Sequence, residues 1–171
     1  MKSIYYVLIG LLIFYLDTLL TFLSPITIGH FSFILVPHLS FLFLMIIAIY
    51  KNTSTALILG VLLGIMQDLY FGQVYGVYLF GYIVSILIAD KFLKVFFRDH
   101  TMLYGMILLG VIFLEIFVMV IYSLLGLIDI NMFGFLVFRI IPTLFLNSLL
   151  LIFMYFIFNR FINQLSTIDT K

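Results

Sequence analysis

Cysteine and tryptophan are both absent from the 171 residues, and charged side chains are scarce. Without cysteine the chain can form no disulfide, no thiolate metal site, no c-type haem attachment and no lipid anchor on a cysteine. Charged residues make up 9% of the sequence, 66% of it is hydrophobic, and its mean hydropathy is +1.38. This composition goes beyond what the core of a soluble protein requires, and it predicts an all-α polytopic membrane protein.

Long apolar stretches fill most of the chain. At about 20 residues per span, six transmembrane helices leave only tails and turns, so residues 1–171 are expected to form a single integral membrane domain without a soluble domain. The expected spans cover residues 4–23, 33–50, 55–71, 74–89, 102–125 and 135–158. The first is longer than a signal-peptide core and has no small-residue cleavage site, so we expect it to stay uncleaved. Residues 24–30 should form a turn, and Pro37 should kink the second helix or mark its start.

The basic residues predict the orientation of the chain. With the N-terminus inside and six spans, every Lys and Arg except Arg139 falls on one side, and the turns on the opposite side carry none. The residues on that side are Lys2, Lys51, Lys91, Lys94, Arg98, Arg160 and Lys171. We therefore expect a multi-pass protein of the cytoplasmic membrane with both termini in the cytoplasm. Because the basic residues lie at the ends of spans, they indicate contact with the lipid bilayer and give no sign of nucleic-acid binding.

A stripe of small residues ends in a carboxylate within the third expected span. Gly60, Gly64 and Asp68 are spaced by four residues, so a helix would place them on one face. The glycines could provide either an intramolecular helix contact or a face where a partner docks. A short turn follows, and it is bracketed by two glycines that would form a tight hairpin. The candidate partner-binding or helix-packing residues of this stretch are Gly60, Gly64, Gln67, Asp68, Gly72 and Gly76.

Four charged residues lie inside the expected spans. Asp17, Asp68 and Glu115 each fall about 20 Å from the cytoplasmic end of their span at 1.5 Å per residue, and Arg139 falls near the same outer level. Charges inside a membrane are costly unless they are paired, so we expect a cluster in which Asp68 pairs with Arg139. The alternative is that these groups form local hydrogen bonds or reach the outer interface by snorkelling.

Catalytic motifs are missing from the sequence. The three histidines, His30, His38 and His100, fall at different depths of the expected topology, so they cannot share a metal ion. We find no serine and histidine pair, no pair of aspartates and no His-Glu-x-x-His helix of an intramembrane protease, and no glycine-rich phosphate loop. The chain is therefore expected to be neither an enzyme nor a binder of metals or cofactors.

Three motifs resemble a known family in their order and spacing. They are Val36-Pro37-His38-Leu39, then Gly60-x-x-x-Gly64-x-x-Gln67-Asp68 with Phe71-Gly72 and Gly76, then Arg139-Ile-Ile-Pro142-Thr-x-x-x-Asn147. This series resembles the MreD family of rod shape-determining membrane proteins over essentially the whole chain. In the last motif, Pro142 removes a backbone hydrogen bond and Asn147 is an amide that needs a partner. Arg139, Pro142 and Asn147 form a second group of candidate residues, which could bind a partner or support folding.

The resemblance implies a non-catalytic scaffold of the cell-elongation machinery, which directs side-wall peptidoglycan synthesis and rod shape. Its implied partners are an MreC-like bitopic protein and an elongation complex with RodA, a class B penicillin-binding protein and MreB. The family is also similar in helix arrangement to the substrate-binding S-components of energy-coupling-factor transporters. The alternative function is therefore a vitamin-binding transporter subunit, although no stretch concentrates the aromatic and polar groups of such a site.

Overall fold

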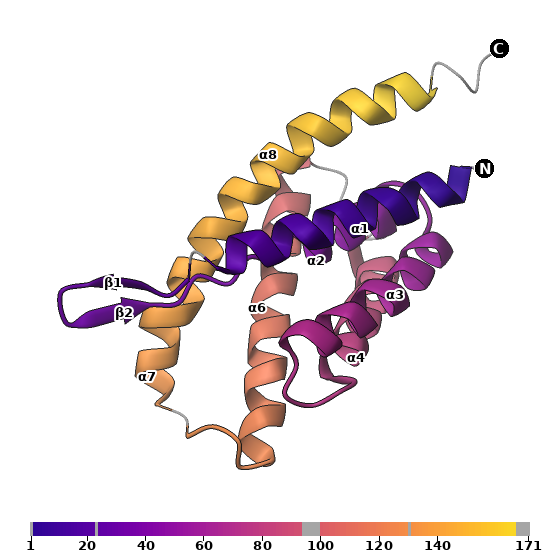
Figure 1. Ribbon diagram of the computed structural model, residues 1–171. Helices are drawn as coiled ribbons and strands as arrows, with labels where there is room; N and C mark the ends of the chain where they lie inside the picture. The colour runs from indigo at the N-terminus through magenta and orange to yellow at the C-terminus, as the bar shows by residue number, and fades with distance from the viewer. Residues whose placement is uncertain (1, 23, 94–99, 130, 167–171) are drawn as a thin grey trace.

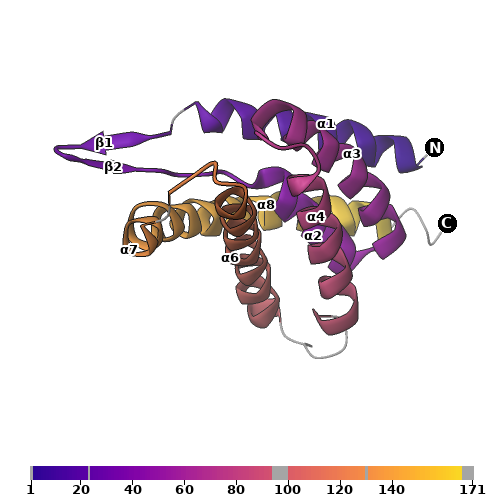
Figure 2. The same ribbon diagram turned by 90° about the horizontal axis from the view of Figure 1, so that it is seen from below.

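The computed structural model describes residues 2–22, 24–93, 100–129 and 131–166 as a bundle of helices with one small β-hairpin (Figure 1). The α-helices are α1 (Lys2–Thr21), α2 (Leu39–Tyr50), α3 (Thr53–Phe71), α4 (Val77–Ile88), α6 (His100–Leu124), α7 (Met132–Phe135) and α8 (Ile141–Ser166). Two π-helical segments continue them: η1 (Ala89–Leu93) follows α4, and η2 (Leu136–Ile140) joins α7 to α8. The start of α1 and the end of α8 lie at the same end of the bundle (Figures 1 and 2).

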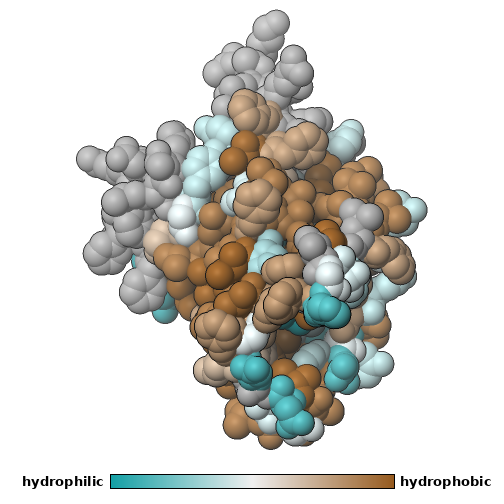
Figure 3. Space-filling model, turned by 90° about the vertical axis from the view of Figure 1, so that its left-hand side faces the viewer, coloured by the Kyte–Doolittle hydropathy of each residue, from teal (hydrophilic) through white to brown (hydrophobic). Residues whose placement is uncertain are grey.

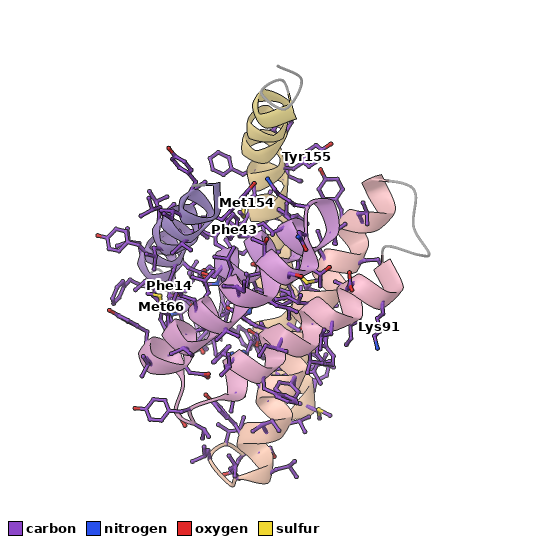
Figure 4. All side chains as sticks on the ribbon, turned by 90° about the vertical axis from the view of Figure 1, so that its right-hand side faces the viewer. Phe14, Phe43, Met66, Lys91, Met154 and Tyr155 are labelled. Atoms are coloured by element: carbon purple, nitrogen blue, oxygen red, sulfur yellow. The ribbon has the colours of Figure 1, made fainter. Side chains whose placement is uncertain are left out.

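Helix α2 forms the centre of the molecule. It packs against α1, α3, α4, α6 and α8, and its side chains from 41 to 48 are at most 4% exposed. Phe43 lies in the middle of the bundle, and Phe14 of α1 packs edge-on against Tyr70 of α3 (Figure 4). Burying such apolar side chains against one another is the main favourable term that fixes this arrangement.

Among the described residues, four helices are long and apolar enough to cross a membrane: Ile4–Thr21, Thr53–Phe71, Leu103–Leu124 and Met132–Phe156. The helical character expected from composition is confirmed. Helices α2 and α4 have 12 residues each, which is less than the roughly 20 that a complete span needs. The count of six spans therefore stays a prediction.

The segment between α1 and α2 differs from the expectation. Instead of a turn over 24–30, the chain forms an antiparallel hairpin, β1 (Ile26–Ile28) and β2 (Phe31–Phe33), which projects beyond the helices (Figures 1 and 2). The expected helical span from residue 33 is also wrong, because α2 begins only at Leu39. Pro37 explains that boundary: it lacks an N–H and keeps the residue before it out of the helical region.

The glycines of the third helix allow α3 and α4 to approach closely. A Cβ atom on Gly64 would lie 2.7 Å from the Cα of Leu79, and one on Gly60 would lie 2.7 Å from the Cδ1 of Ile86. Both neighbours belong to α4, so the glycines serve an intramolecular helix contact. Gly76 starts α4 with φ of 97°, a left-handed conformation that glycine adopts without strain.

Replacing Gly64 by leucine should separate α3 from α4, since the new side chain would meet backbone that cannot move aside. We expect the stability to fall by about 1–3 kcal/mol, the usual cost of overpacking a core. The measurement is thermal unfolding of the detergent-solubilised protein. Gly105→Leu is the matched control, because a Cβ at Gly105 meets nothing within 4 Å. Equal unfolding temperatures for the two variants would contradict the close α3–α4 contact.

Candidate functional site

Two buried carboxylates bind the N-termini of the 12-residue helices α2 and α4. Asp17 near the end of α1 accepts hydrogen bonds from the backbone N–H groups of Leu39 (3.1 Å) and Ser40 (3.1 Å) at the start of α2. The first N–H groups of a helix have no partner within the helix, and the helix dipole favours a negative charge there. Asp17, which is 1% exposed, therefore satisfies the start of α2 inside the bundle.

Asp68 near the end of α3 does the same for α4. Its carboxylate accepts from the backbone N–H groups of Gly76 (3.0 Å), Tyr78 (2.8 Å) and Leu79 (3.0 Å). Gly72 ends α3, and a Cβ on it would lie 2.6 Å from the carbonyl oxygen of Asp68. Two helical hairpins, α1 with α2 and α3 with α4, thus use the same device, in which the long helix carries the cap of the short one.

The extended segment 34–38 runs along α8, and two side chains of that helix bind its backbone. Asn147 accepts from the backbone N–H of His38 (2.9 Å) and donates to the carbonyl of Val36 (2.8 Å). Thr143 accepts from the N–H of Val36 (3.1 Å) and donates to the carbonyl of Ile34 (3.3 Å). Non-helical backbone is tolerated at membrane depth only where protein satisfies it, and these two α8 side chains supply most of what the segment needs.

Pro142 leaves a backbone carbonyl free to bind this segment. As a proline it has no N–H to donate to the carbonyl four residues earlier, that of Phe138. This carbonyl instead accepts from the backbone N–H of Ile34 (2.8 Å), directly after the hairpin. The ring of Phe138 also stacks on Phe31 of β2, with ring centroids 5.5 Å apart. The π-helical segment η2 ends just before Pro142, in keeping with the interrupted hydrogen-bond pattern.

A buried ion cluster completes the network. Glu115 of α6 is 2% exposed, and its two oxygens lie 2.8 Å from His38 Nε2 and 2.7 Å from Arg139 Nε. Pairing with an arginine offsets the cost of burying the carboxylate. Three elements distant in sequence, α6, η2 and the segment before α2, are joined at this point.

The expected pair of Asp68 and Arg139 is therefore wrong. Arg139 pairs with Glu115, while Asp68 and Asp17 bind backbone N–H groups through local contacts between helices. Gln67 is buried on α3, and its Oε1 has no hydrogen-bond partner among the described residues. His38 and Thr143 lie within the family motifs, but sequence reasoning did not name them as candidate site residues. The Val36-Pro37-His38 run was the available signal, because a helix-breaking segment inside the bundle needs nearby polar groups to satisfy its backbone.

The polar side chains of this network form hydrogen bonds with backbone groups and ion pairs with one another. The carboxylates of Asp17, Asp68 and Glu115 are engaged by N–H groups or by cations, so none is free to act as a base on a bound molecule. A groove of about 190 Å³ between α2, α4 and α6 is lined mainly by apolar side chains such as Met45, Met106 and Phe113. Its hydroxyl, Ser85, donates to the Gly81 carbonyl (2.7 Å), so the groove offers little to recognise a polar substrate.

Comparison with known proteins identifies the family of this chain. The family model for the rod shape-determining protein MreD matches residues 1–165. The chain belongs to the MreD family. No curated protein and no solved structure matches it. The expected similarity to transporter S-components therefore gains no support, and neither does the alternative function as a vitamin-binding subunit.

Family membership agrees with the fold. MreD proteins are shape-determining membrane proteins and are not known as enzymes, so a role in rod shape determination follows for this chain. The apolar spans and the family together identify a membrane protein. Four residues of the family motifs, His38, Asp68, Pro142 and Asn147, belong to this network. The network satisfies backbone groups in the connection from α1 to α2 and in the connection from α3 to α4.

Asp68→Ala should destabilise this MreD-family protein strongly, because three buried N–H groups at the start of α4 lose their acceptor. We expect a loss of about 2 kcal/mol or more, the upper end for removal of a helix cap. The stability of Asp68→Asn, which keeps one acceptor oxygen, should lie between that of Asp68→Ala and that of the wild type. Thermal unfolding in detergent measures the effect, with the exposed Asp129→Ala as control. An Asp68→Ala protein as stable as the control would refute the capping role.

Asn147→Leu tests the bonds between α8 and the extended segment. The substitution keeps the number and branching of the side-chain heavy atoms but leaves the His38 N–H and the Val36 carbonyl without their partner. The expected cost is about 1–3 kcal/mol for each group. We expect a lower unfolding temperature and faster proteolysis between α1 and α2. Ser148→Ala is the neighbouring control, since the Ser148 hydroxyl bonds to Phe145 of its own helix (2.8 Å). Unchanged cleavage in Asn147→Leu would show that the segment is held by other means.

Proposed function

We propose that the chain is a non-catalytic scaffold of the cell-elongation machinery, inserted in the cytoplasmic membrane with both termini inside. In this role it binds an MreC-like bitopic protein and helps to direct side-wall peptidoglycan synthesis and rod shape. The wider elongation complex would include RodA, a class B penicillin-binding protein and MreB. The observation that supports this proposal best is the use of the buried polar side chains to hold the chain's own backbone.

The outer surface of the bundle supports the same role. Large apolar side chains are exposed along α1, α3 and α8, and apolar residues dominate the face on which the hairpin lies (Figure 3). In the two least buried spans, Leu12 is 62% exposed and Phe153 is 63% exposed. Such surfaces can contact lipid or a membrane helix of another protein. A chain that presents mainly apolar helix faces is suited to hold a single-span partner within the membrane.

Basic residues lie at the end of the bundle where the chain starts, which fits the proposed orientation. Lys51 lies at the end where the chain starts, with its ammonium 4.5 Å from the Tyr6 ring centre. Lys91 on η1 is exposed, and its side chain points away from the bundle (Figure 4). Basic residues and tyrosine at one end are typical of the cytoplasmic interface of a membrane protein.

The absence of cysteine makes a clean cross-linking test possible. Single cysteines at Leu12 and Phe153, each labelled with a photoreactive group, should capture the MreC-like partner in cells from at least one of the two faces. The adjacent Ile13 (8% exposed) and Met154 (6% exposed) are the matched buried controls and should capture none. Cells without the chain should lose rod shape and regain it with each functional cysteine variant.

The scaffold proposal fails on a defined result. If neither exposed position captures an elongation protein, if the tagged wild type purifies without one, and if cells lacking the chain stay rod-shaped, the proposed role is wrong. Capture from the exposed and buried positions alike would show that the labelling reports unfolded protein, and the captured partner would then not count as evidence for the scaffold.

A further inference from the structure

Arg139 carries more hydrogen-bond donors than the described residues use. A guanidinium has five N–H groups, and the Nε–H of Arg139 donates to Glu115 at 2.7 Å. Within the described ranges, Glu115 is its only hydrogen-bond partner, and 29% of the Arg139 side chain is exposed. In an apolar environment unsatisfied donors are costly, so the terminal N–H groups need an acceptor from outside the chain.

The guanidinium is held in place from several sides. Glu115, which receives the Nε–H, is itself fixed by His38 at 2.8 Å through its other oxygen. The Arg139 Cζ lies 5.9 Å from the centre of the Phe135 ring, which adds a cation–π contact. The cation thus keeps a defined position whether or not a ligand is present, and such preorganisation lowers the cost of binding.

Exposed apolar side chains lie on the same helical segment as this cation and on the hairpin that contacts that segment. Leu136, on the same π-helical segment, is 49% exposed, and Phe31, which stacks on the adjacent Phe138, is 59% exposed. Figure 3 shows that apolar residues cover most of the face on which the hairpin lies. Arg139 comes seven residues after Met132, where α7 begins, which places it about 10 Å along the helix from that end. A cation next to apolar and aromatic side chains at this depth matches the phosphate and upper acyl region of a phospholipid.

We propose that Arg139, at the junction of η2 and the hairpin, binds the phosphate of an outer-leaflet phospholipid whose acyl chain lies against Leu136 and Phe31. The choice of leaflet rests on the orientation given under the proposed function. The planar guanidinium matches the oxygens of a phosphate and can bind two of them at once. Charge complementarity and the apolar surroundings together select a lipid over a free anion.

The test uses thermal unfolding of the purified full-length protein in a neutral detergent. Three additives are compared: phosphatidylglycerol, diacylglycerol with the same acyl chains, and inorganic phosphate. We expect phosphatidylglycerol alone to raise the unfolding temperature of the wild type. Arg139→Lys keeps a cation beside Glu115 but loses the guanidinium fork, so it should need about tenfold more phosphatidylglycerol for the same shift. Lys91→Gln, at the opposite end of the bundle, should respond like wild type.

A second measurement keeps the inference testable if Arg139→Lys does not fold. Native mass spectrometry of the wild type should then show phosphatidylglycerol retained in preference to diacylglycerol. Equal effects of the two lipids, an equal effect of inorganic phosphate, or a full response in a folded Arg139→Lys would overturn the inference. Loss of the lipid effect with capture of the partner intact would refute this site alone. A lipid effect combined with the three negative results that refute the scaffold would refute the scaffold alone.

Discussion

The constraint on which this structure depends is the need to satisfy backbone N–H and C=O groups inside an apolar bundle. Helix α2 starts at Leu39, deep among the other helices, and the five residues before it are extended. Every unpaired polar group there would cost free energy comparable to a lost hydrogen bond. Asp17 accepts hydrogen bonds from the N–H groups at the start of α2, and Asn147 and Thr143 bind backbone groups of the extended residues. Side chains from α1 and α8 thus form hydrogen bonds that these residues would form within a longer helix.

The same solution appears twice, which gives the bundle an internal regularity. Asp17 and Asp68 each lie within the last two turns of a long helix and bind the first N–H groups of the short helix that follows. In membrane transporters, helix N-termini at this depth commonly face a substrate anion. Here the chain's own carboxylates occupy both positions. Neither helix N-terminus therefore needs an anion from outside the chain.

The sequence predicted the apolar helices and the stripe of glycines on one helix face because both depend on spacing along one helix, but it left open whether the stripe contacts another helix of the chain or a partner. It did not predict the hairpin, since Phe31 to Val36 is as apolar as a span and hydropathy cannot distinguish a strand from a helix in such a run. The pairing of Asp68 with Arg139 failed for another reason. Counting residues gives depth along the membrane normal, but the side of the helix and the neighbour it faces depend on tertiary packing.

This division between interior and surface affects how mutations in the family motif should be interpreted. Asp68, Pro142 and Asn147 act on the backbone of the chain itself, and His38 binds the buried Glu115, so replacing any of them alters folding before it alters any contact with a partner. A variant at these positions that loses cell shape therefore says little about where the partner binds. Residues such as Leu12 and Phe153, which face outward and support no internal bond that the structure describes, can separate the two effects. The motif specifies the shape of the bundle, and the exposed apolar surface is the place to test for the proposed partner.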